Sequence, residues 1–455
     1  MLASRIETPH DGVLTPAMER MAPGAVLDAC REQLTDVEAT QRDRWRGCAA
    51  IEALYHPGRY VRIAYALTDR DEIPQHRMWP EADIVYLHAP VREPMSRRGT
   101  LLTLDGMDFE AYRFPNDRRL RNVRKFAARS TAGDVWQGWL DQAGKGERIE
   151  RETLQRHLIR YVPEQKWVVR LRADVASGDG AEPEQTRIAV RSAPPDACAA
   201  LRDRHMHLRR IAKRDTPDLI VAKVIGDDVE SGFFAVNWIQ GKTLLEALAG
   251  DGGDRMMIRM ASALNRFHGI AVPGLADLTT ADIVGRVENA VADLCVTLPE
   301  LSDRLRPIGV ATVARLSEVG TSDTVTLHND MHFKQVRVRS KRIGILDLDR
   351  LAIGDPLIDV ANFATQLCML GVRTDHSIDA ATARGWANAF LDEWGRATGR
   401  PIDAGRYRCY AVLSLVELAR GMMRHLRTGW RALAGRCVDQ AEAELAAVGR
   451  EAVVA

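Results

Sequence analysis

Three side chains with oxygen ligands stand close together in the sequence, on either side of a predicted hairpin. Asp330 and Gln335 precede it, and Asp347 follows it. Alternating apolar residues around a polar tip at residues 339–341 predict two paired strands over residues 336–345. Because a hairpin returns its two ends to one place, the spacing predicts that two carboxylates and one amide oxygen gather around a single point.

These oxygen atoms suit Mg²⁺, which takes few protein ligands and keeps its waters and substrate phosphates. With Gln335 and Asp347 on the metal, Asp330 is left to hold an acceptor hydroxyl and take its proton, as phosphoryl transfer requires. For any one of these residues alone, the simpler interpretation is a polar turn residue beside exposed strands. The ordered set favours a phosphoryl-transfer site.

The motif around these residues is longer. It reads Leu327-His328-Asn329-Asp330-Met331-His332, then Gly344-Ile345-Leu346-Asp347-Leu348-Asp349, then Gly354-Asp355-Pro356 and Asp359-Val360-Ala361-Asn362. This pattern resembles the catalytic core of the aminoglycoside phosphotransferase and choline kinase-like superfamily. With glutamine at position 335, the motif is most similar to that of the maltokinase-like branch, which carries glutamine at the metal-ligand position. The resemblance implies a bilobal protein-kinase-like fold.

The resemblance also implies roles for single residues. Asp330 matches the catalytic base, and Gln335 and Asp347 match the metal ligands. Supporting roles are expected for His328, which would tie the catalytic loop to its surroundings, for Asp359, which would anchor it through buried hydrogen bonds, and for His332 and Asp349. Glutamine replaces the asparagine of most relatives, so the alternative to an active enzyme is a catalytically weak or inactive pseudo-kinase that acts as a nucleotide-binding or regulatory protein.

Residues 232–244 resemble the last strand, the interlobe hinge and the first helix of the same superfamily. By position, Val236 precedes the hinge, and the backbone of Asn237, Trp238 and Ile239 would meet the adenine edge. Arg191 is the candidate for the basic residue that holds phosphate, since its planar fork can bind phosphate through two hydrogen bonds. An ordinary strand is the alternative interpretation of each segment. ATP is the expected phosphate donor, bound between the two lobes.

Runs of strands followed by runs of helices predict an α+β protein, and 455 residues predict more than one domain. We expect an N-terminal α/β cap or extension over residues 1–150, and a nucleotide-binding N-lobe with a small mixed sheet over 151–240. A larger helical C-lobe with the catalytic loop would follow over 241–455. Similar residues near Tyr55 and Tyr161 hint at two related sheets, but their spacing differs too much to predict a repeat.

Acids and bases nearly cancel, with 63 Lys and Arg against 62 Asp and Glu, which argues against a nucleic-acid partner. The seven cysteines stand singly, so neither a disulfide framework nor a cysteine zinc site is expected. No apolar run is long enough to span a bilayer, and the start of the sequence lacks an apolar signal core. We expect a cytoplasmic protein without a membrane partner.

Together these features predict an enzyme that moves the γ-phosphate of ATP, with Mg²⁺, to a hydroxyl of a small soluble molecule. The acceptor would be a sugar, an amino-alcohol or an aminoglycoside-like compound. It would lie near Asp330, with candidate lining residues Asp349, Arg350, Trp386, Glu393 and Glu417. The many arginines over residues 420–436 favour a neutral or anionic acceptor. A protein kinase is disfavoured because the H-R-D, D-F-G and A-P-E motifs are missing from the sequence, and the oligomeric state is left open.

Overall fold

The computed structural model describes residues 7–69, 83–93, 95–177, 181–250, 252–318, 323–373, 377–399 and 401–454. The chain forms two compact units. Unit 1 consists of Met1–Arg202, Val224–Trp238 and Met422–Trp430, and unit 2 consists of Asp203–Lys223, Ile239–Gly421 and Arg431–Ala455. Strands dominate unit 1 and helices dominate unit 2, which confirms the predicted α+β class. The three-part division at residues 150 and 240 stays a prediction.

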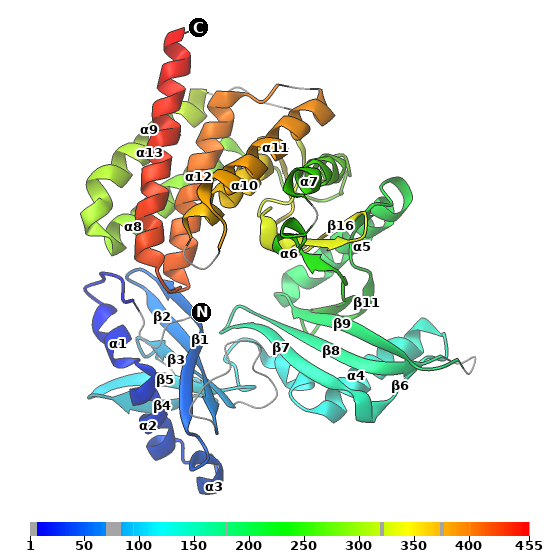
Figure 1. Ribbon diagram of the computed structural model, residues 1–455. Helices are drawn as coiled ribbons and strands as arrows, with labels where there is room; N and C mark the ends of the chain where they lie inside the picture. Colours follow the sequence, from blue (N-terminus) through cyan, green and yellow to red (C-terminus); the bar gives the residue numbers. More distant parts are fainter. Residues whose placement is uncertain are drawn as a thin grey trace. The chain divides into compact units, whose positions relative to one another are not determined.

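Two sheets form the centre of unit 1 (Figure 1). The first contains β1 (Gly47–His56), β2 (Tyr60–Thr68), β3 (Asp83–Ala89), β4 (Thr100–Leu104) and β5 (Met107–Arg113). The second contains β6 (Arg148–Ile149), β7 (Gln155–Val162), β8 (Lys166–Ala176), β9 (Glu184–Ser192), β11 (Val224–Asp228) and β12 (Phe233–Asn237). Within the described residues all pairings of the second sheet are antiparallel. The predicted mixed sheet is therefore wrong for this region.

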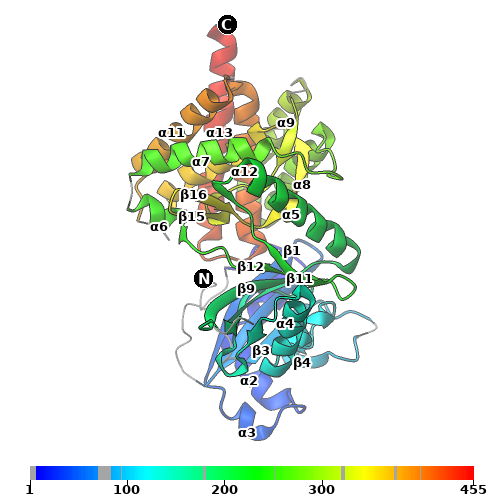
Figure 2. The ribbon, with the colours of Figure 1, turned by 90° about the vertical axis from the view of Figure 1, so that its right-hand side faces the viewer.

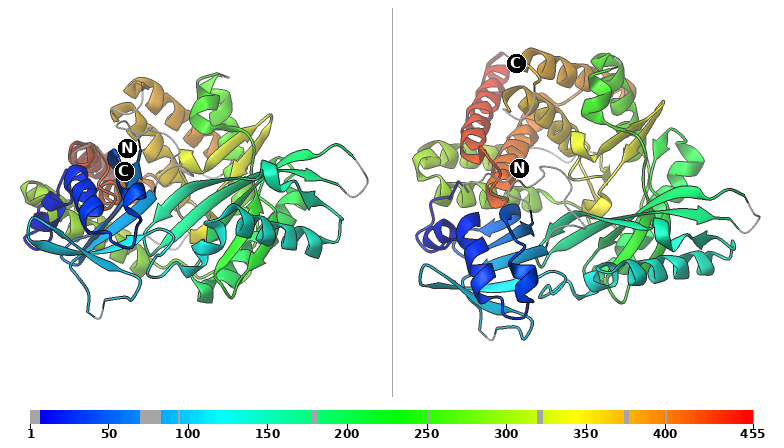
Figure 3. Two further views of the ribbon diagram at one scale, coloured as in Figure 1. Left: turned by 90° about the horizontal axis from the view of Figure 1, so that it is seen from below. Right: turned by 60° about the horizontal axis from the view of Figure 1, so that its bottom comes forward.

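The helices of unit 1 surround these sheets. They are α1 (Thr15–Arg20), α2 (Pro23–Gln33), α3 (Ala39–Arg42), α4 (Arg129–Ala143) and the 3₁₀ helices η1 (Arg121–Phe126) and η2 (Arg151–Thr153). The first two helices, in dark blue, lie against the blue strands of the first sheet, and α2 contacts β1 and β4 (Figure 3). The helix α5 (Pro195–Asp215) begins in unit 1 and ends in unit 2.

The two sheets of unit 1 repeat one topology. The first has the strand order β1-β2-β3-β5-β4, and the second has the order β7-β8-β9-β12-β11, with β6 also beside β8. A helix precedes each first hairpin, α2 in one copy and α4 in the other. The turns of the two hairpins also match, since Gly58 and Glu164 have positive φ values of 64° and 61°. The structure thus contains the repeat that the sequence analysis did not predict.

A buried aspartate ties down the same point in each copy. Asp11 accepts hydrogen bonds from the N–H groups of Val13 and Leu14 at 3.0 and 3.1 Å, the Tyr55 hydroxyl at 2.7 Å and the Gly58 N–H at 2.8 Å. Asp117 accepts the equivalent hydrogen bonds from the N–H groups of Arg119 at 2.7 Å, Leu120 at 2.8 Å and Glu164 at 3.0 Å, and from the Tyr161 hydroxyl at 2.7 Å. In both copies the tyrosine lies 44 residues and the turn residue 47 residues after the aspartate.

One hydrophobic cluster joins the two sheets of unit 1. It includes Tyr86 and Tyr112 of the first sheet, whose rings stack with centroids 4.9 Å apart, and Trp167 and Phe233 of the second. Trp136 of α4 is fully buried in the same cluster. Since both copies contribute to it, the two sheets share one core.

Charged side chains are buried beside this core. Arg92 donates to Glu110 at 2.7 Å and to Glu164 at 2.9 Å, and Arg62 lies 3.2 Å from Glu164. The Arg62 guanidinium also donates to Nδ1 of His88 at 3.0 Å. Burial, together with Arg92 and Arg62, lowers the pKa of His88 to about 3. The imidazole of His88 is therefore neutral in the folded protein at neutral pH.

Unit 2 combines short strands with long helices. Its strands are β10 (Leu219–Ile220), β13 (Lys242–Thr243), β14 (Val325–Leu327), β15 (Val336–Arg339), β16 (Arg342–Ile345) and β17 (Ala352–Gly354). One sheet has the order β10-β16-β15-β13, and β14 pairs with β17. The 3₁₀ helices are η3 (Pro299–Leu301), η4 (Phe333–Gln335), η5 (Leu348–Arg350) and η6 (Met369–Val372).

The α-helices of unit 2 form its larger part. They are α6 (Leu244–Leu248), α7 (Gly253–His268), α8 (Thr280–Thr297), α9 (Ser302–Glu318), α10 (Leu357–Cys368), α11 (Ala380–Thr398), α12 (Ala404–Arg424) and α13 (Trp430–Val454). Figure 2 shows α7 alongside α11, and the two are in contact. The helix α7 buries Met256, Met260, Ala263, Leu264 and Phe267, an apolar stripe with helical spacing. In the described ranges, no helix is both long and apolar enough to cross a bilayer.

The buried aspartate of the second copy gives a test of the repeat. We expect Asp117→Asn to lower the free energy of unfolding by about 2–4 kcal/mol, because an amide nitrogen cannot accept the hydrogen bonds that the carboxylate accepts. Urea denaturation measures the change. Asp108 is exposed and accepts one hydrogen bond from Thr103, so Asp108→Asn is the control, with a change within about 0.5 kcal/mol. Equal effects of the two substitutions would contradict the assigned role.

His88 gives a pH-dependent stability. The unfolded chain takes up a proton near the ordinary pKa of 6.5, whereas the folded protein does so only near about 3. The free energy of unfolding therefore falls as the pH decreases below about 6.5, by about 1.4 kcal/mol per pH unit from this histidine. Urea denaturation between about pH 5 and about pH 7.5 measures the slope. His88→Gln should reduce it, and replacement of the exposed His10 by Gln is the control; an unchanged slope in His88→Gln would refute the assignment.

Candidate active site

The predicted hairpin is confirmed and brings residues 335 and 347 to one end of the sheet. Val336 pairs with Ile345 as the last rung of β15 and β16. Beyond that rung, the Leu346 N–H donates to the Gln335 carbonyl at 2.9 Å. Asp347 follows directly, with a left-handed φ of 55°. The backbone geometry therefore places Gln335 and Asp347 on either side of the open end of the hairpin.

Asp330 is half-buried in the loop between β14 and η4. Burial raises the pKa of its carboxyl, Arg350 and His328 lower it, and Asp347 raises it again. Nε2 of His328, two residues before Asp330, lies 2.7 Å from the carbonyl of Leu346, which directly precedes Asp347. The structure thus brings Asp330 near the hairpin end that carries Gln335 and Asp347.

The carboxylate of Asp359, on the first turn of α10, holds the loop that carries Asp330. It is fully buried and accepts hydrogen bonds from the N–H groups of His328 at 2.7 Å and Asn329 at 2.8 Å. Nε2 of His268 lies 3.1 Å from the same carboxylate. The loop thus has its backbone fixed immediately before Asp330.

A second residue of α10 holds the loop after Asp330. The Asn362 side chain donates to the Met331 carbonyl at 2.9 Å and accepts a hydrogen bond from the Ser414 hydroxyl at 2.7 Å. Since positions three apart share one helix face, Asp359 and Asn362 bracket the loop together. The sequence analysis gave no role to Asn362, although its spacing from Asp359 was a usable signal.

His328 links the loop to the strand that leads to Asp347. Its ring Nε2 lies 2.7 Å from the Leu346 carbonyl. The side chain is completely buried. Its contact therefore couples the position of the catalytic loop to that of the β16 end.

Arg286 of α8 is a further residue that sequence reasoning missed. Its guanidinium donates to the Asn329 side chain at 2.7 Å and to the two carboxylate oxygens of Glu417 at 2.9 and 2.5 Å. Arg286 stands 43 residues before Asn329, and no motif marked it. Glu417, a candidate acceptor-lining residue, forms this ion pair within unit 2.

His332 and Gln335 lie side by side. Nε2 of His332 is 3.4 Å from the amide nitrogen of Gln335, and Nδ1 of His332 accepts the Lys334 N–H at 3.2 Å. With the amide nitrogen assigned to His332, the amide oxygen of Gln335 is the atom left for a metal. Asp349 lies in η5, next to Arg350.

The residues predicted to bind nucleotide lie along β9, β12 and the segment after β12. Arg191 pairs with Phe234 across the strands, and its guanidinium carbon is 5.4 Å from the centre of the Phe234 ring. Val236 and Asn237 are the last residues of β12. The Trp238 N–H donates to the Arg187 carbonyl at 2.9 Å, so at Trp238 only the carbonyl remains for the predicted adenine contact.

Ile239 is packed in unit 2. A Cβ atom added at Gly344 of β16 would come within 2.9 Å of the Ile239 side chain, so only glycine allows this close approach. The segment after β12 is thereby held against the strand that leads to Asp347.

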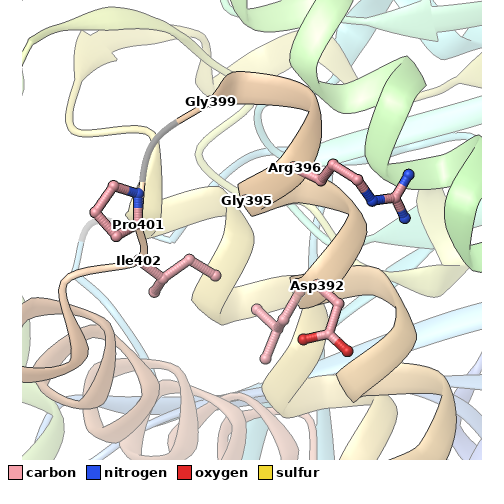
Figure 4. A pocket seen from close by; sticks show the side chains of 7 residues that line it. Asp392, Gly395, Arg396, Gly399, Pro401 and Ile402 are labelled. Atoms are coloured by element: carbon pink, nitrogen blue, oxygen red, sulfur yellow. The ribbon is translucent and has the colours of Figure 1, made fainter.

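Metal and ligand sites elsewhere were also considered. In the part of the chain that the structure describes, no group of three or more His, Cys, Asp and Glu side chains is placed to hold a metal; the set predicted here differs because one of its ligands is an amide. A shallow hollow at the end of α11 is lined by Leu391, Asp392, Gly395, Arg396, Gly399, Pro401 and Ile402 (Figure 4). None of the predicted site residues lines this hollow.

The site residues lie in a segment that a protein-family model matches. The model of the Phosphotransferase enzyme family matches residues 164–402, more than half of the chain. The chain belongs to this family. The matched range contains all the residues predicted for catalysis, metal and nucleotide, and it excludes the first sheet of unit 1. The resemblance to this superfamily and its protein-kinase-like fold is thus confirmed, while the maltokinase-like branch stays a prediction.

Solved structures of kinases are similar to this member of the phosphotransferase family. A choline kinase from Cryptosporidium parvum has 10% identity and a TM-score of 0.47, covering 67% of this chain and 92% of its own. An amicoumacin kinase in complex with AMP-PNP and Ca²⁺ has 12% identity, a TM-score of 0.46 and coverages of 68% and 93%. A choline/ethanolamine kinase family protein from Mesorhizobium loti has 15% identity, a TM-score of 0.42 and coverages of 60% and 84%. Comparison with curated proteins finds no match.

The anchoring contacts of Asp359 predict the effect of its loss. Asp359→Asn should destabilise the protein by about 2–4 kcal/mol, because the amide leaves a buried donor of the loop without an acceptor. Phosphotransferase activity should fall as well. Urea denaturation measures the first effect, with Asp392→Asn, at an exposed position on α11, as the control. An Asp359→Asn protein with the stability of the control would show that the carboxylate does not hold the loop.

Proposed function

We propose that this chain transfers the γ-phosphate of ATP to a hydroxyl group of a small molecule, with Asp330 as the catalytic base. The observation that carries the proposal is the position of Asp330. It lies in a loop whose backbone is held on both sides by Asp359 and Asn362, and His328 of the same loop contacts the end of β16 that leads to Asp347. Family membership supports the reaction class.

The residues at the hairpin end fit a divalent cation of the Mg²⁺ type. Asp347 offers a carboxylate and Gln335 an amide oxygen, and hard oxygen ligands are the ones that Mg²⁺ prefers. The carboxylate of Asp347 also raises the pKa of Asp330, an unfavourable proximity of like charges that a cation would relieve. Gln335 and Asp347 would hold the ion, which when bound offsets negative charge on the phosphates.

Asp330 acts on the acceptor. Its carboxylate accepts a hydrogen bond from the hydroxyl, orients the oxygen towards the γ-phosphorus and takes the proton as the new P–O bond forms. The bond between the γ-phosphorus and the bridging oxygen breaks, and ADP carries away that electron pair. Burial raises the pKa of Asp330, and electrostatic interactions with Arg350 and His328 oppose that rise, which favours the carboxylate form that this role requires.

Other residues position the donor and the acceptor. We assign the adenine edge to the backbone of residues 236–239 and a phosphate contact to Arg191. The acceptor is a sugar, an amino-alcohol or an aminoglycoside-like compound that presents its hydroxyl to Asp330.

Replacement of Asp330 tests this role. Asp330→Asn should lower turnover by about 10²–10⁴-fold, because the amide cannot take the proton, while the affinity for Mg·ATP stays within about threefold of the wild type. Detection of phosphorylated products from a panel of hydroxylated metabolites measures turnover, and calorimetry measures nucleotide binding. Asp254→Asn, on the exposed side of α7, is the control.

The same experiment separates an enzyme from a pseudo-kinase. A wild-type protein that binds Mg·ATP but phosphorylates none of the panel and hydrolyses no ATP would favour the nucleotide-binding alternative. Full turnover by Asp330→Asn would remove Asp330 from the mechanism.

A further inference from the structure

An ion pair between two helices of unit 2 reaches the catalytic loop. Arg286 of α8 donates through Nε to Oε1 of Glu417 at 2.9 Å and through Nη2 to Oε2 at 2.5 Å. Its remaining nitrogen, Nη1, donates to Oδ1 of Asn329 at 2.7 Å. All three nitrogens of the guanidinium are thus engaged, two with α12 and one with the loop.

Asn329 is the residue that needs this support. Its φ is 59°, in the left-handed region, which asparagine adopts more readily than other residues that carry a side chain but which still costs free energy relative to the right-handed region. The Asp359 carboxylate holds its backbone N–H at 2.8 Å, and Arg286 holds its side chain. Since Asp330 follows directly, the backbone rotation at Asn329 decides where the Asp330 carboxylate points.

The chemistry of the contact is specific for arginine. The planar fork binds Glu417 through two parallel hydrogen bonds, which fix the plane of the guanidinium and so the direction of Nη1. A lysine ammonium at this position would keep the charge and lose that fixed plane. The side chains of Arg286 and Glu417 are 22% and 26% exposed, so the pair is largely shielded from solvent.

We propose that Arg286, oriented by Glu417, is a positioning residue for phosphoryl transfer: it holds Asn329 in the left-handed conformation and thereby aims Asp330. The inference rests on the proposed function, because a catalytic base needs a defined orientation of its carboxylate towards the acceptor hydroxyl. Small displacements of a catalytic group are costly, and about 1 Å can lower the rate by about 10²-fold.

The same two helices carry a matched control. Arg420 of α12 donates to Asp293 of α8 at 2.7 Å, and the two side chains are 22% and 24% exposed. Among the described residues, the hydrogen bonds of the catalytic loop, residues 328–331, join it to Arg286, Leu346, Asp359 and Asn362, and neither Arg420 nor Asp293 is among these partners. Loss of the Arg420–Asp293 pair therefore weakens the packing of α8 on α12 without releasing the loop.

The experiment compares Arg286→Gln, Arg286→Lys, Glu417→Gln and Arg420→Gln with the wild type and Asp330→Asn. The acceptor is the compound with the highest turnover in the metabolite panel, or water where none reacts, and the readouts are kcat, KM for Mg·ATP and Tm. We expect Arg286→Gln and Arg286→Lys to lower kcat by about 10–100-fold with KM for Mg·ATP nearly unchanged. Glu417→Gln should show a smaller loss of the same kind, and Arg420→Gln should keep the wild-type kcat.

Each other result overturns the inference. If Arg286→Gln and Arg420→Gln have the same kcat, either because both keep the wild-type value or because both lose activity together with Tm, the Arg286–Glu417 ion pair has a structural role only. A wild-type kcat in Arg286→Lys shows that charge is sufficient and that the fork does not aim the loop. Equal turnover by the wild type and Asp330→Asn refutes the proposed function itself, and the role of Arg286 with it.

A variant on the loop keeps the test usable if Arg286→Gln does not fold. Asn329→Val leaves Arg286 and Glu417 in place, but a β-branched residue strongly disfavours a positive φ. It should lower kcat as Arg286→Gln is expected to do. A wild-type kcat in Asn329→Val would show that the conformation of residue 329 does not matter for transfer.

Discussion

The catalytic loop depends on one buried carboxylate. Asp359 has no exposed surface, and it accepts the backbone N–H groups of two successive loop residues as well as the side chain of His268. A buried carboxylate is favourable only when such donors surround it. The carboxylate and the loop thus require each other, and this mutual requirement is what holds Asp330 at a constant place relative to α10.

The other contacts of the site extend this constraint in different directions. Asn362 holds the far side of the loop, His328 links it to the end of β16, and Arg286 links it to α8 and α12. The hairpin then adds Gln335 and Asp347 through its own backbone pairing. The reactive residues are therefore placed mostly by hydrogen bonds to backbone groups, to which Arg286 adds a contact with the Asn329 side chain.

The sequence was sufficient for the parts of the site that are local. A short hairpin predicts its own geometry, so the pairing that brings residues 335 and 347 to one end of the hairpin followed from their spacing. Arg286 was missed because its contact depends on the packing of α8 beside the loop, which no local pattern encodes. The repeated sheets were missed because they share few residues. In each copy a tyrosine lies 44 residues and a turn residue 47 residues after a buried aspartate, and the strands between them differ in sequence.

Because the two sheets of unit 1 share one core, neither sheet is expected to fold without the other. The family match begins at residue 164, which is the turn between β7 and β8, so that β7 and the entire first sheet fall outside it. Yet Trp167 and Phe233, inside the matched range, are buried in one cluster with Tyr86, Tyr112 and Trp136, which lie outside it. A fragment trimmed to the matched range would expose this aromatic surface to water and lose half of a hairpin. In this chain the segment that the family model matches is shorter than the smallest piece that can be expected to fold.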